Sequence, residues 1–396
     1  MRDDWRAVRL GAVTQQVRVR HAPNPAVPYR LLGVRSRGRG AFLREELLGS
    51  ETKAVALTPV RRGQFIYNRL FAGTGSFGVV PMELDGSWVS GEFPLFDVDE
   101  SRVDVHFLGL VFQQPAVWER VAAECVGTTG SRMRWHERKF AEFEIDLPPF
   151  IEQRRIADLI SAVDIAIESA STVRRQASAL WRSWADDVWA STTDEVQLGA
   201  IGRVVTGSTP STTRPEYWHP AEVPFFGPGD LGDEPVITES RRYVSRSGAG
   251  AVRPIAAPAV VQVCVGFGTG KVAVLGVPGC TNQQMNALVG LDDVDAIAAM
   301  AMLRSAGGRD RLLSITGLTV TPVVKKSGWA AMRIRWPSRE ARILLTGVVT
   351  DAAQVADGAG RTAEALNVLR AALLAELLDG RHQLPAAYDR FLSPAA

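Results

Sequence analysis

Apolar residues recur at steps of four and three along a stretch that begins at Pro148 and ends near Ser191. They are Ile156, Ile160, Val163, Ile167, Ala170, Ala177, Trp181, Trp184 and Val188. A period of about 3.5 residues is typical of a helix that packs along a second helix. Pro149 suits the first turn of such a helix, where no backbone N–H donor is needed, and no Pro or Gly interrupts the stretch after it. The pattern therefore predicts one long helix over 148–190.

A second long segment near the C-terminus repeats this rhythm and ends at Gly380. Its apolar positions are Ala352, Val355, Ala359, Thr362, Leu366, Leu369, Leu373 and Leu377. Glycine is common just past the end of a helix, so we predict a helix over 337–380 and a tail over 381–396. Spacing alone would also fit two amphipathic core helices of one globular domain.

Short motifs of the first half of the chain recur, in the same order and at a nearly constant offset, in the second half. The matched pairs are Val8–Val13 with Val196–Ile201, Thr129-Gly130 with Thr316-Gly317, Ile145–Pro148 with Ile334–Pro337, and Arg155-Ile156 with Arg342-Ile343. Each half ends in one of the long helices, which favours a tandem duplication over two core helices of a single domain.

Each half also mixes strand-like and helix-like segments. The expected strands are Gln64–Tyr67, Gly78–Val80, Trp88–Ser90, Val260–Val265 and Val272–Leu275, and the expected short helices are Val117–Glu124 and Val294–Ser305. We predict an α+β fold: two α+β domains in a tandem pseudo-twofold repeat, over 1–147 and 195–336, separated by a long antiparallel two-helix coiled coil.

Composition excludes some classes of protein. The 396 residues are 46% hydrophobic with a net charge of +2, which does not by itself indicate a polyanionic partner. No apolar run approaches the roughly 18 residues of a membrane span, and the N-terminus lacks the apolar core of a signal peptide. Three cysteines form no Cys-x-x-Cys pair. The sequence therefore predicts a cytoplasmic protein without membrane contact.

Long helices have a geometric consequence. At 1.5 Å per residue, helices of 30–40 residues measure roughly 45–60 Å. Packed antiparallel, they would hold two domains at a fixed separation, comparable with one to one and a half turns of DNA at ~34–36 Å per turn. The pattern is thus compatible with two half-sites separated by an unread spacer.

Several motifs resemble those of the specificity (S) subunits of type I restriction–modification systems. The segment that resembles the start of the central helix of that family is Pro148–Ala157 followed by Asp164, with Pro-Pro-x-x-Glu-Gln as its most specific part. Segments that resemble the recognition domains are Gly127–Arg132, Leu198–Ile201, Thr206–Ser211, Glu216–Trp218, Gly268–Val272 and Thr281–Gln284. The second helix start, Trp336–Glu340, departs from the family pattern because it lacks the second Pro and the Glu-Gln pair.

The resemblance implies a DNA-binding subunit without catalytic activity or a cofactor of its own. Such a subunit would read a bipartite, asymmetric target in double-stranded DNA, one half-site per recognition domain. Its partners would be two S-adenosylmethionine-dependent adenine methyltransferase subunits, with an ATP-driven restriction subunit as a further partner.

Two motifs resemble catalytic loops but lack required residues. Leu147–Phe150 resembles the polar-Pro-Pro-aromatic loop of amino-methyltransferases, but Leu147 cannot hydrogen-bond a target amine. Gly266–Lys271 resembles a phosphate-binding loop, but Val265 and Val272 stand where that loop needs Gly and a hydroxyl residue. The five histidines are scattered, without metal-ligand spacing. These gaps favour a binding protein with no metal site.

Basic, amide and hydroxyl side chains supply phosphate and base-edge contacts in DNA complexes. The candidates for DNA binding are Arg18, Arg20, Arg35, Arg37, Arg39, Arg61, Arg62, Asn68, Arg69, Arg132, Arg134, Thr206, Ser208, Thr209, Ser211, Thr212, Arg214, Lys271, Gln283, Gln284, Lys325 and Lys326. The candidates for docking of the methyltransferase subunit are Glu152, Gln153, Arg154, Arg155, Trp181 and Trp184. Ordinary solvated surface, or helix packing in the case of the tryptophans, is the alternative for each.

Two other functions stay open at this point. One is a self-contained DNA methyltransferase fused to recognition domains, which would need a cofactor-binding loop and a polar-Pro-Pro-aromatic loop, and the sequence lacks both. The other is a coiled-coil scaffold with two protein-binding heads, which would show no preference among DNA sequences.

Overall fold

The computed structural model describes residues 4–127, 133–316 and 322–391. The chain divides into two compact units. The first comprises 1–167 and 365–396, and the second comprises 168–364. Each unit therefore contains part of both long helices.

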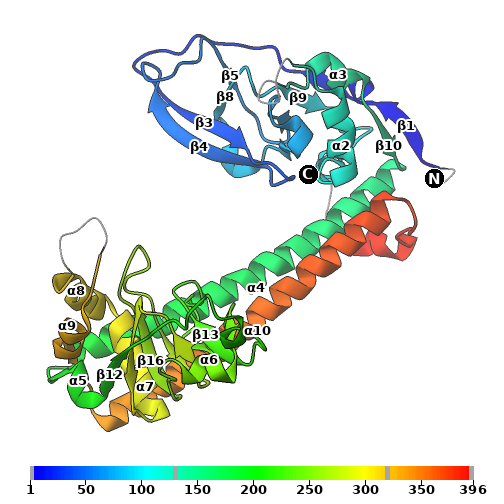
Figure 1. Cartoon of the computed structure of the whole chain (residues 1–396). Helices are drawn as coiled ribbons and strands as arrows, with labels where there is room; N and C mark the ends of the chain where they lie inside the picture. Colours follow the sequence, from blue (N-terminus) through cyan, green and yellow to red (C-terminus); the bar gives the residue numbers. More distant parts are fainter. Residues whose placement is uncertain (1–3, 128–132, 317–321, 392–396) are drawn as a thin grey trace. The chain divides into compact units, whose positions relative to one another are not determined.

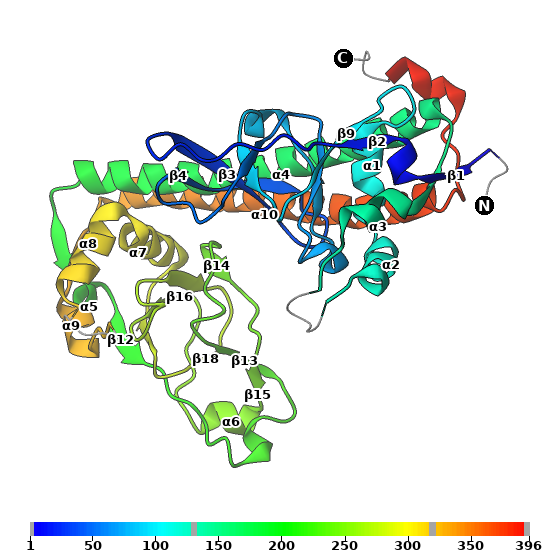
Figure 2. The ribbon, with the colours of Figure 1, turned by 90° about the horizontal axis from the view of Figure 1, so that it is seen from above.

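The two long helices are α4 (Phe150–Ser191, 42 residues) and α10 (Arg339–Leu378, 40 residues). They lie side by side in both views (Figures 1 and 2). In the first unit Ile156 and Ile160, near the start of α4, share a core with Leu374 and Leu377 at the end of α10. In the second unit the end of α4 shares a core with the start of α10. The helices are antiparallel, as predicted.

The buried face of the helices differs in part from the predicted one. Trp184, expected to be buried, is 43% exposed, and Val355 and Leu369 of α10 are 53% and 47% exposed. Ala185 and Trp189 are buried instead. Together with Trp181 they follow steps of four, because this end of α4 packs against the core of the second unit as well as against α10. A strict 3.5-residue period therefore assigned the wrong face here.

Within the described residues of the first unit, ten strands form two four-stranded sheets and one pair. The strands are β1 (Arg6–Arg9), β2 (Thr14–Gln16), β3 (Pro28–Val34), β4 (Ala41–Leu48), β5 (Leu57–Pro59), β6 (Phe65–Tyr67), β7 (Phe77–Val79), β8 (Trp88–Ser90), β9 (Leu95–Val98) and β10 (Glu144–Leu147). One sheet has the order β2-β9-β6-β7 and the other β4-β3-β8-β5, and β1 pairs with β10. The helices are α1 (Val105–Val111), α2 (Pro115–Glu124) and α3 (Glu137–Glu142).

Aromatic side chains fill the core of the first unit. Phe65 and Tyr67 from β6 are fully buried, and the rings of Phe96 and Phe140 stack with centroids 3.9 Å apart. Stacked and tilted aromatic pairs contribute roughly 0.5–1.5 kcal/mol each beyond the area that they bury. The core therefore fixes the β6–β7 hairpin against the helices.

In the part of the second unit that the structure describes, the strands form a five-stranded sheet, a three-stranded sheet and one pair. The strands are β11 (Glu195–Gln197), β12 (Arg203–Thr206), β13 (Val223–Phe226), β14 (Val236–Ile237), β15 (Tyr243–Val244), β16 (Ala259–Val263), β17 (Val272–Leu275), β18 (Cys280–Thr281), β19 (Met285–Val289) and β20 (Arg333–Arg335). The sheet orders are β12-β19-β16-β17-β14 and β15-β13-β18, and β11 pairs with β20. The helices are α5 (Leu198–Ile201), α6 (Arg246–Gly250), α7 (Asp293–Arg304), α8 (Ala306–Ser314) and α9 (Lys326–Ala331).

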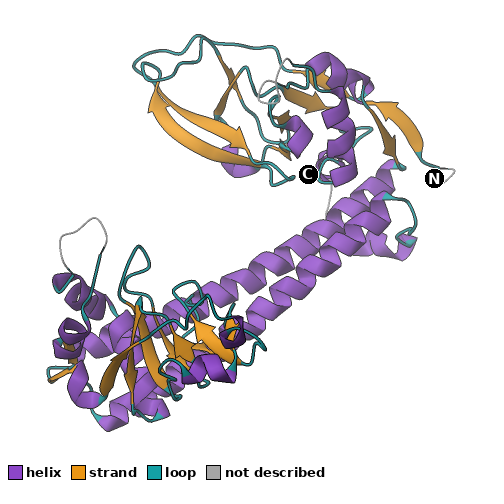
Figure 3. Cartoon of the chain, in the orientation of Figure 1, coloured by secondary structure: helices purple, strands orange, loops and turns teal. Residues whose placement is uncertain are grey.

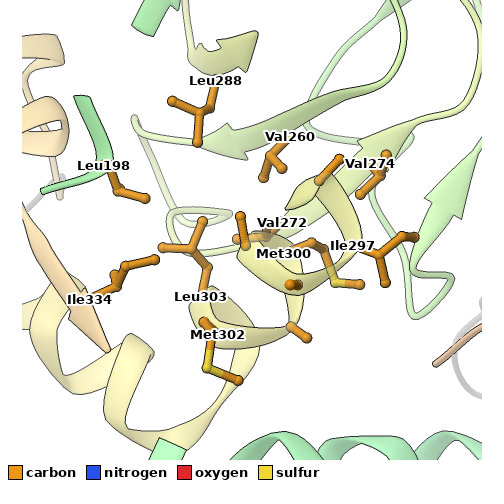
Figure 4. Close-up of a cluster of buried hydrophobic side chains, with 14 of the residues drawn as sticks. Leu198, Val260, Val272, Val274, Leu288, Ile297, Met300, Met302, Leu303 and Ile334 are labelled. Atoms are coloured by element: carbon orange, nitrogen blue, oxygen red, sulfur yellow. The ribbon is translucent and has the colours of Figure 1, made fainter. Parts of the chain in front are cut away.

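Helix α7 covers one face of the five-stranded sheet (Figure 3). Its residues from Ala296 to Leu303 are all buried. Small alanine side chains let the helix approach the strands closely, while Met300 and Leu303 fill the space beside Val260 and Leu288 (Figure 4). This core also receives Ile334, so the strand that leads into α10 is held by the same cluster (Figure 4).

The strand order recurs in the two units. In each unit, one sheet has its first strand in chain order (β2 or β12) paired with its last strand (β9 or β19), and the last strand is paired in turn with a hairpin (β6–β7 or β16–β17). In each, an outer pair of strands, β1 with β10 and β11 with β20, leads into a long helix. This recurrence is what a tandem duplication predicts, and it gives the two β hairpins, β6–β7 and β16–β17, equivalent places.

Candidate nucleic-acid interface

Predicted arginines of the first unit gather at a junction of two turns. The β3–β4 turn carries Arg35, Arg37 and Arg39, all exposed. Its backbone is joined to the β6–β7 turn because the Arg37 amide donates to the Thr74 carbonyl at 2.9 Å and the Gly38 amide to the Gly75 carbonyl at 2.7 Å. Arg37 has a left-handed φ of 62°, which the paired turns hold in place. Three guanidinium groups are thereby presented from a fixed backbone.

Other arginines of the first unit have carboxylate partners. Arg61 donates to both oxygens of Asp97 at 3.0 and 2.9 Å, and Arg134 pairs with Glu92 at 3.2 Å. Arg69 pairs with Glu137, and each of these two side chains is 19% exposed. Arg61 and Asp97 line two open surface pockets, with volumes of about 420 and 690 Å³. These arginines offer a phosphate less free charge than the exposed arginines of the β3–β4 turn.

The remaining candidates of the first unit divide into exposed and buried groups. Arg18, Arg20 and Arg62 are exposed. Asn68 is 9% exposed, and its Oδ1 accepts from the Leu70 amide at 3.0 Å, so it stabilises the turn after β6. Arg132 lies outside the residues that the structure describes.

The second unit brings together two candidate segments that are far apart in sequence. The Thr206 hydroxyl donates to Asn286 Oδ1 at 2.7 Å, and the Thr209 hydroxyl donates to Gln283 Oε1 at 2.7 Å. Gln284 Oε1 accepts from the side-chain Nδ2 of Asn282 at 3.1 Å. The loop after β12 and the turn before β19 therefore form one polar surface, as base-edge reading would require.

Further along the loop after β12, polar side chains are accessible. Arg214 donates to the Tyr217 hydroxyl at 2.8 Å, and Ser211 is hydrogen-bonded to Thr213 at 2.8 Å. Thr212 is exposed and Ser208 half-buried.

Three lysines lie near the β16–β17 turn. Lys271, Lys325 and Lys326 are exposed, and no carboxylate pairs with them within the described part of the chain. The amide of Val324, next to Lys325, donates to the Cys264 carbonyl at 2.8 Å, which ties this segment to the end of β16. The three charges are therefore available to an anionic ligand.

A polar residue that the sequence reasoning missed lies behind the polar surface of the second unit. Gln262 in β16 is fully buried and stands opposite Asn286 of β19 in register. Neither atom of its side-chain amide has a hydrogen-bond partner among the described residues. A glutamine inside the run Ala259–Val263 was the available signal, because a polar residue in a buried strand is unusual.

The start of α4 is a buried junction. Gln153 accepts from the Asp104 amide at 2.9 Å and donates to the carbonyls of Arg102 and Pro148 at 3.1 and 3.0 Å. Arg155 donates to Asp389 Oδ2 at 2.7 Å, and this hydrogen bond holds the pKa of Asp389 below its ordinary value. Glu152 is 2% exposed, and its carboxylate accepts from the side-chain Nε2 of Gln383 at 3.4 Å. The motif residues thus join the helix to α1 and to the C-terminal tail.

The tryptophans of α4 differ in accessibility. Trp181 is 1% exposed, and the Arg304 guanidinium lies 5.6 Å from its ring centre. Burial lowers the pKa of Arg304 to about 10. Trp184 keeps 43% of its surface exposed, and Arg154 is half-buried. Of the docking candidates, these two are the most accessible to another protein.

Other kinds of site were also sought in the described ranges. There, no three His, Cys, Asp or Glu side chains gather closely enough to hold a metal ion. None of the helices in those ranges combines the length and the apolar character that a bilayer crossing requires. Burial raises the pKa of the Cys264 and Cys280 thiols to about 11.

Comparison with known proteins identifies the class of fold. No protein-family model matches the chain. The sequence is 20% identical to the type I restriction enzyme HindI specificity subunit of Haemophilus influenzae, covering 85% of this chain and 90% of that protein. The crystal structure of a type I restriction–modification S subunit from M. genitalium superposes with a TM-score of 0.59 at 14% identity, covering 94% of this chain and 96% of that one.

A second solved structure has the same fold as this chain. A chain from a study of complex assembly and conformational transition of the type I R-M system gives a TM-score of 0.54 at 20% identity, over 95% of this chain and 98% of that one. The fold is that of a type I S subunit. The predicted resemblance to type I specificity subunits is confirmed, and it extends over nearly the whole chain.

Proposed function

We propose that this chain is the DNA sequence-specificity subunit of a type I restriction–modification complex and performs no catalysis itself. The observation that carries the proposal is a specificity-subunit fold in which one strand order occurs twice, each time with an exposed polar or cationic surface at the same hairpin. Two recognition surfaces on one chain fit a target with two half-sites.

The two surfaces differ in chemistry, which supports an asymmetric target. The first presents Arg35, Arg37 and Arg39, and guanidinium groups favour guanine edges and phosphates. The second presents Thr209, Gln283 and nearby lysines, and amide groups pair well with adenine edges. Each half-site therefore has its own sequence.

The long helices set the spacer between the half-sites. Helix α4 runs for 42 residues without a break, which corresponds to roughly 60 Å at 1.5 Å per residue. Its packing against α10 in both units stiffens it. A paired helix of constant length fixes a constant number of unread base pairs.

The methyltransferase subunits dock on the exposed apolar face of α4. Val173, Leu180 and Trp184 are 43%, 60% and 43% exposed, and their spacing of seven and four residues places them on one side of the helix. Exposed apolar stripes on otherwise polar helices are typical of protein interfaces, and tryptophan is enriched at their centres. The complex contains two such subunits, and an ATP-dependent restriction subunit completes it in the cytoplasm.

The test begins with the methylated motifs of the host genome, sequenced with and without this gene. A bipartite adenine-methylated motif should disappear when the gene is deleted. The chain co-expressed with the methyltransferase subunit should then bind a duplex carrying that motif at least tenfold more tightly than one with a scrambled half-site, since a mismatched pair costs about 1–3 kcal/mol. Methylation by the chain alone, or equal binding of both duplexes, would refute the proposal.

Docking has its own test. The Leu180→Ala, Trp184→Ala double variant should lose co-purification with the methyltransferase subunit, while Val55→Ala should keep it. Val55 is 92% exposed and lies in the segment between β4 and β5 of the first unit, so it controls for loss of surface apolar area. Unchanged co-purification of the double variant would place the interface elsewhere.

A further inference from the structure

The two equivalent hairpins carry the same short motif in their turns. The β6–β7 turn reads Phe71-Ala72-Gly73-Thr74-Gly75, and the β16–β17 turn reads Gly266-Phe267-Gly268-Thr269-Gly270. The Gly-Thr-Gly run is common to both turns, and each turn has one phenylalanine before it: Phe71 two residues ahead of Gly73, and Phe267 directly ahead of Gly268. The two phenylalanines are therefore offset by one residue when the Gly-Thr-Gly runs are aligned. The strands on either side show little other likeness, so the turn is a feature that the two units share at one structural position.

The two turns are fixed in the same way. The Thr74 hydroxyl donates to the Phe71 carbonyl at 2.9 Å, and the Thr269 hydroxyl donates to the Gly266 carbonyl at 2.7 Å. The last glycine of each motif has a left-handed φ, 79° at Gly75 and 99° at Gly270, which favours glycine over other residues. The backbone that carries each phenylalanine is therefore held before any ligand binds.

In each unit a second segment of the chain makes backbone hydrogen bonds to the residues at the start of the turn. In the first unit the Trp135 amide donates to the Arg69 carbonyl at 3.1 Å, just before Phe71. In the second unit the Val324 amide donates to the Cys264 carbonyl at 2.8 Å, and the Gly266 amide donates to the Pro322 carbonyl at 3.1 Å. These hydrogen-bonded segments directly precede equivalent short helices, α3 in the first unit and α9 in the second.

Both phenylalanine rings face solvent. Phe267 is 99% exposed and Phe71 is 53% exposed, whereas Phe65 and Phe77 of the first hairpin are buried. A fully exposed ring adds nothing to the core of its own unit, so folding does not account for Phe267. Two water-exposed rings on two fixed, equivalent turns indicate a ligand that both units contact.

The surroundings of the rings are cationic and polar rather than apolar. Near Phe71, Arg37 is joined to Thr74 through the backbone, and the Ser36 hydroxyl lies 3.2 Å from the Thr74 hydroxyl. Near Phe267, Lys271 follows the turn directly and Lys325 sits on the segment that ties it down. An aromatic ring framed by cations fits a nucleic acid, which offers bases to stack on and phosphates to pair with.

We propose that Phe71 and Phe267 are specificity-determining residues that enter the duplex and stack on bases, one in each half-site. This proposal rests on the function proposed above. Insertion of an apolar wedge partly unstacks a base step, and flexible pyrimidine–purine steps unstack at lower cost. Each ring therefore selects the step it enters, in addition to the bases that polar side chains read.

The test uses the full complex with the methyltransferase subunit and its methylated motif. Phe71→Ala and Phe267→Ala should each weaken binding of the target duplex about tenfold, because one base stacked on an aromatic side chain is lost. Phe71→Trp and Phe267→Trp should retain affinity, and the fluorescence of the new tryptophan should be quenched on binding. Val55→Ala and Leu313→Ala remove exposed apolar side chains of the same two units and serve as controls.

A probe in the DNA adds a readout that is independent of affinity. 2-Aminopurine placed at successive steps should brighten at one step in each half-site with the wild-type complex. Phe71→Ala should abolish the signal in one half-site only, and Phe267→Ala in the other.

The outcomes separate this proposal from the one on which it rests. The first outcome is that the wild-type complex discriminates its motif, while both alanine variants show wild-type DNA affinity and wild-type 2-aminopurine fluorescence. The stacking role is then refuted and the specificity function stands. If the alanine variants lose the methyltransferase subunit and keep DNA affinity, the rings contact protein and the stacking role is again refuted. If the wild-type complex binds no duplex, both proposals fail.

Discussion

Arg370 of α10 binds Asp164 of α4 through Nη2 and Oδ2 at 3.0 Å, and the same Nη2 donates to Gln113 Oε1 at 2.9 Å. Gln113 lies between α1 and α2. One guanidinium group therefore joins both long helices to the segment between α1 and α2 of the first unit. Asp164 belongs to the helix segment that resembles the specificity subunits, and in this chain it pairs α4 with α10.

We expect Arg370→Ala to lower the free energy of unfolding by about 1 kcal/mol, because Arg370 is only 20% exposed and contacts two partners. Arg361→Ala is the matched control. Its ion pair with Asp357 lies on the helix surface with both side chains more than 60% exposed, so roughly 0.3 kcal/mol is expected. Urea denaturation followed by circular dichroism measures both values, and equal losses would contradict the assigned role of Arg370.

Gln153→Ala should destabilise the first unit by about 2 kcal/mol, because it removes three hydrogen bonds made by a buried side chain to the partly buried Asp104 N–H and to the carbonyls of Arg102 and Pro148. Gln176→Ala, an exposed position on the same helix, should have little effect. Thermal unfolding of the two variants is the measurement. A docking role for Gln153 would instead leave stability unchanged and reduce co-purification with the methyltransferase subunit.

The thiols of Cys264 and Cys280 should react slowly in the folded protein. Their pKa of about 11 means that only about one thiol in a thousand is ionised at pH 8. The unfolded thiol ionises first, near pH 9, so this contribution to stability is complete below pH 9 and is lost as the pH rises toward 11. Rates of iodoacetamide labelling at pH 8, with and without urea, check this. Rapid labelling of either residue without urea would contradict it.

Deletion of seven residues from each long helix should change the DNA spacer and leave the half-sites as they are. Removing two turns shortens each helix by roughly 10 Å, the length of about three base pairs. Duplexes with the original half-sites and spacers of graded length would then show a preferred spacer about three base pairs shorter, or no binding at all. Retained preference for the original spacer would show that the length of the paired helices does not set the spacer.

The sequence predicted the long helices and the hairpin strands well, because their signals are local. Apolar periodicity marks α4 and α10, and β-branched runs mark β16 and β17. The β3–β4 hairpin was missed because Ala41–Leu48 carries charged residues at its centre and is largely solvated. Its charged centre gives no apolar alternation, although it forms an edge of a sheet.

The candidate site was less predictable, because partners distant in sequence decide which charges remain available. Arg61 and Arg37 look equivalent in the sequence and both are exposed, yet Arg61 is paired with Asp97 while Arg37 lies on a turn fixed by backbone hydrogen bonds. Glu152 and Gln153 look like solvated helix residues, yet the tail and α1 cover them. Exposure of Phe267 follows from the turn geometry of β16–β17, which no apolar period encodes.

The first compact unit takes its last piece from residues 365–396, so its two segments are separated by the entire second unit. On the ribosome, Ile156 and Ile160 emerge long before Leu374 and Leu377, their partners in the core. At 5–20 residues per second the delay is roughly 10–40 s. During that interval Ile156 and Ile160 of the nascent chain lack their core partners, so the core of the first unit can close only after the end of α10 has been synthesised.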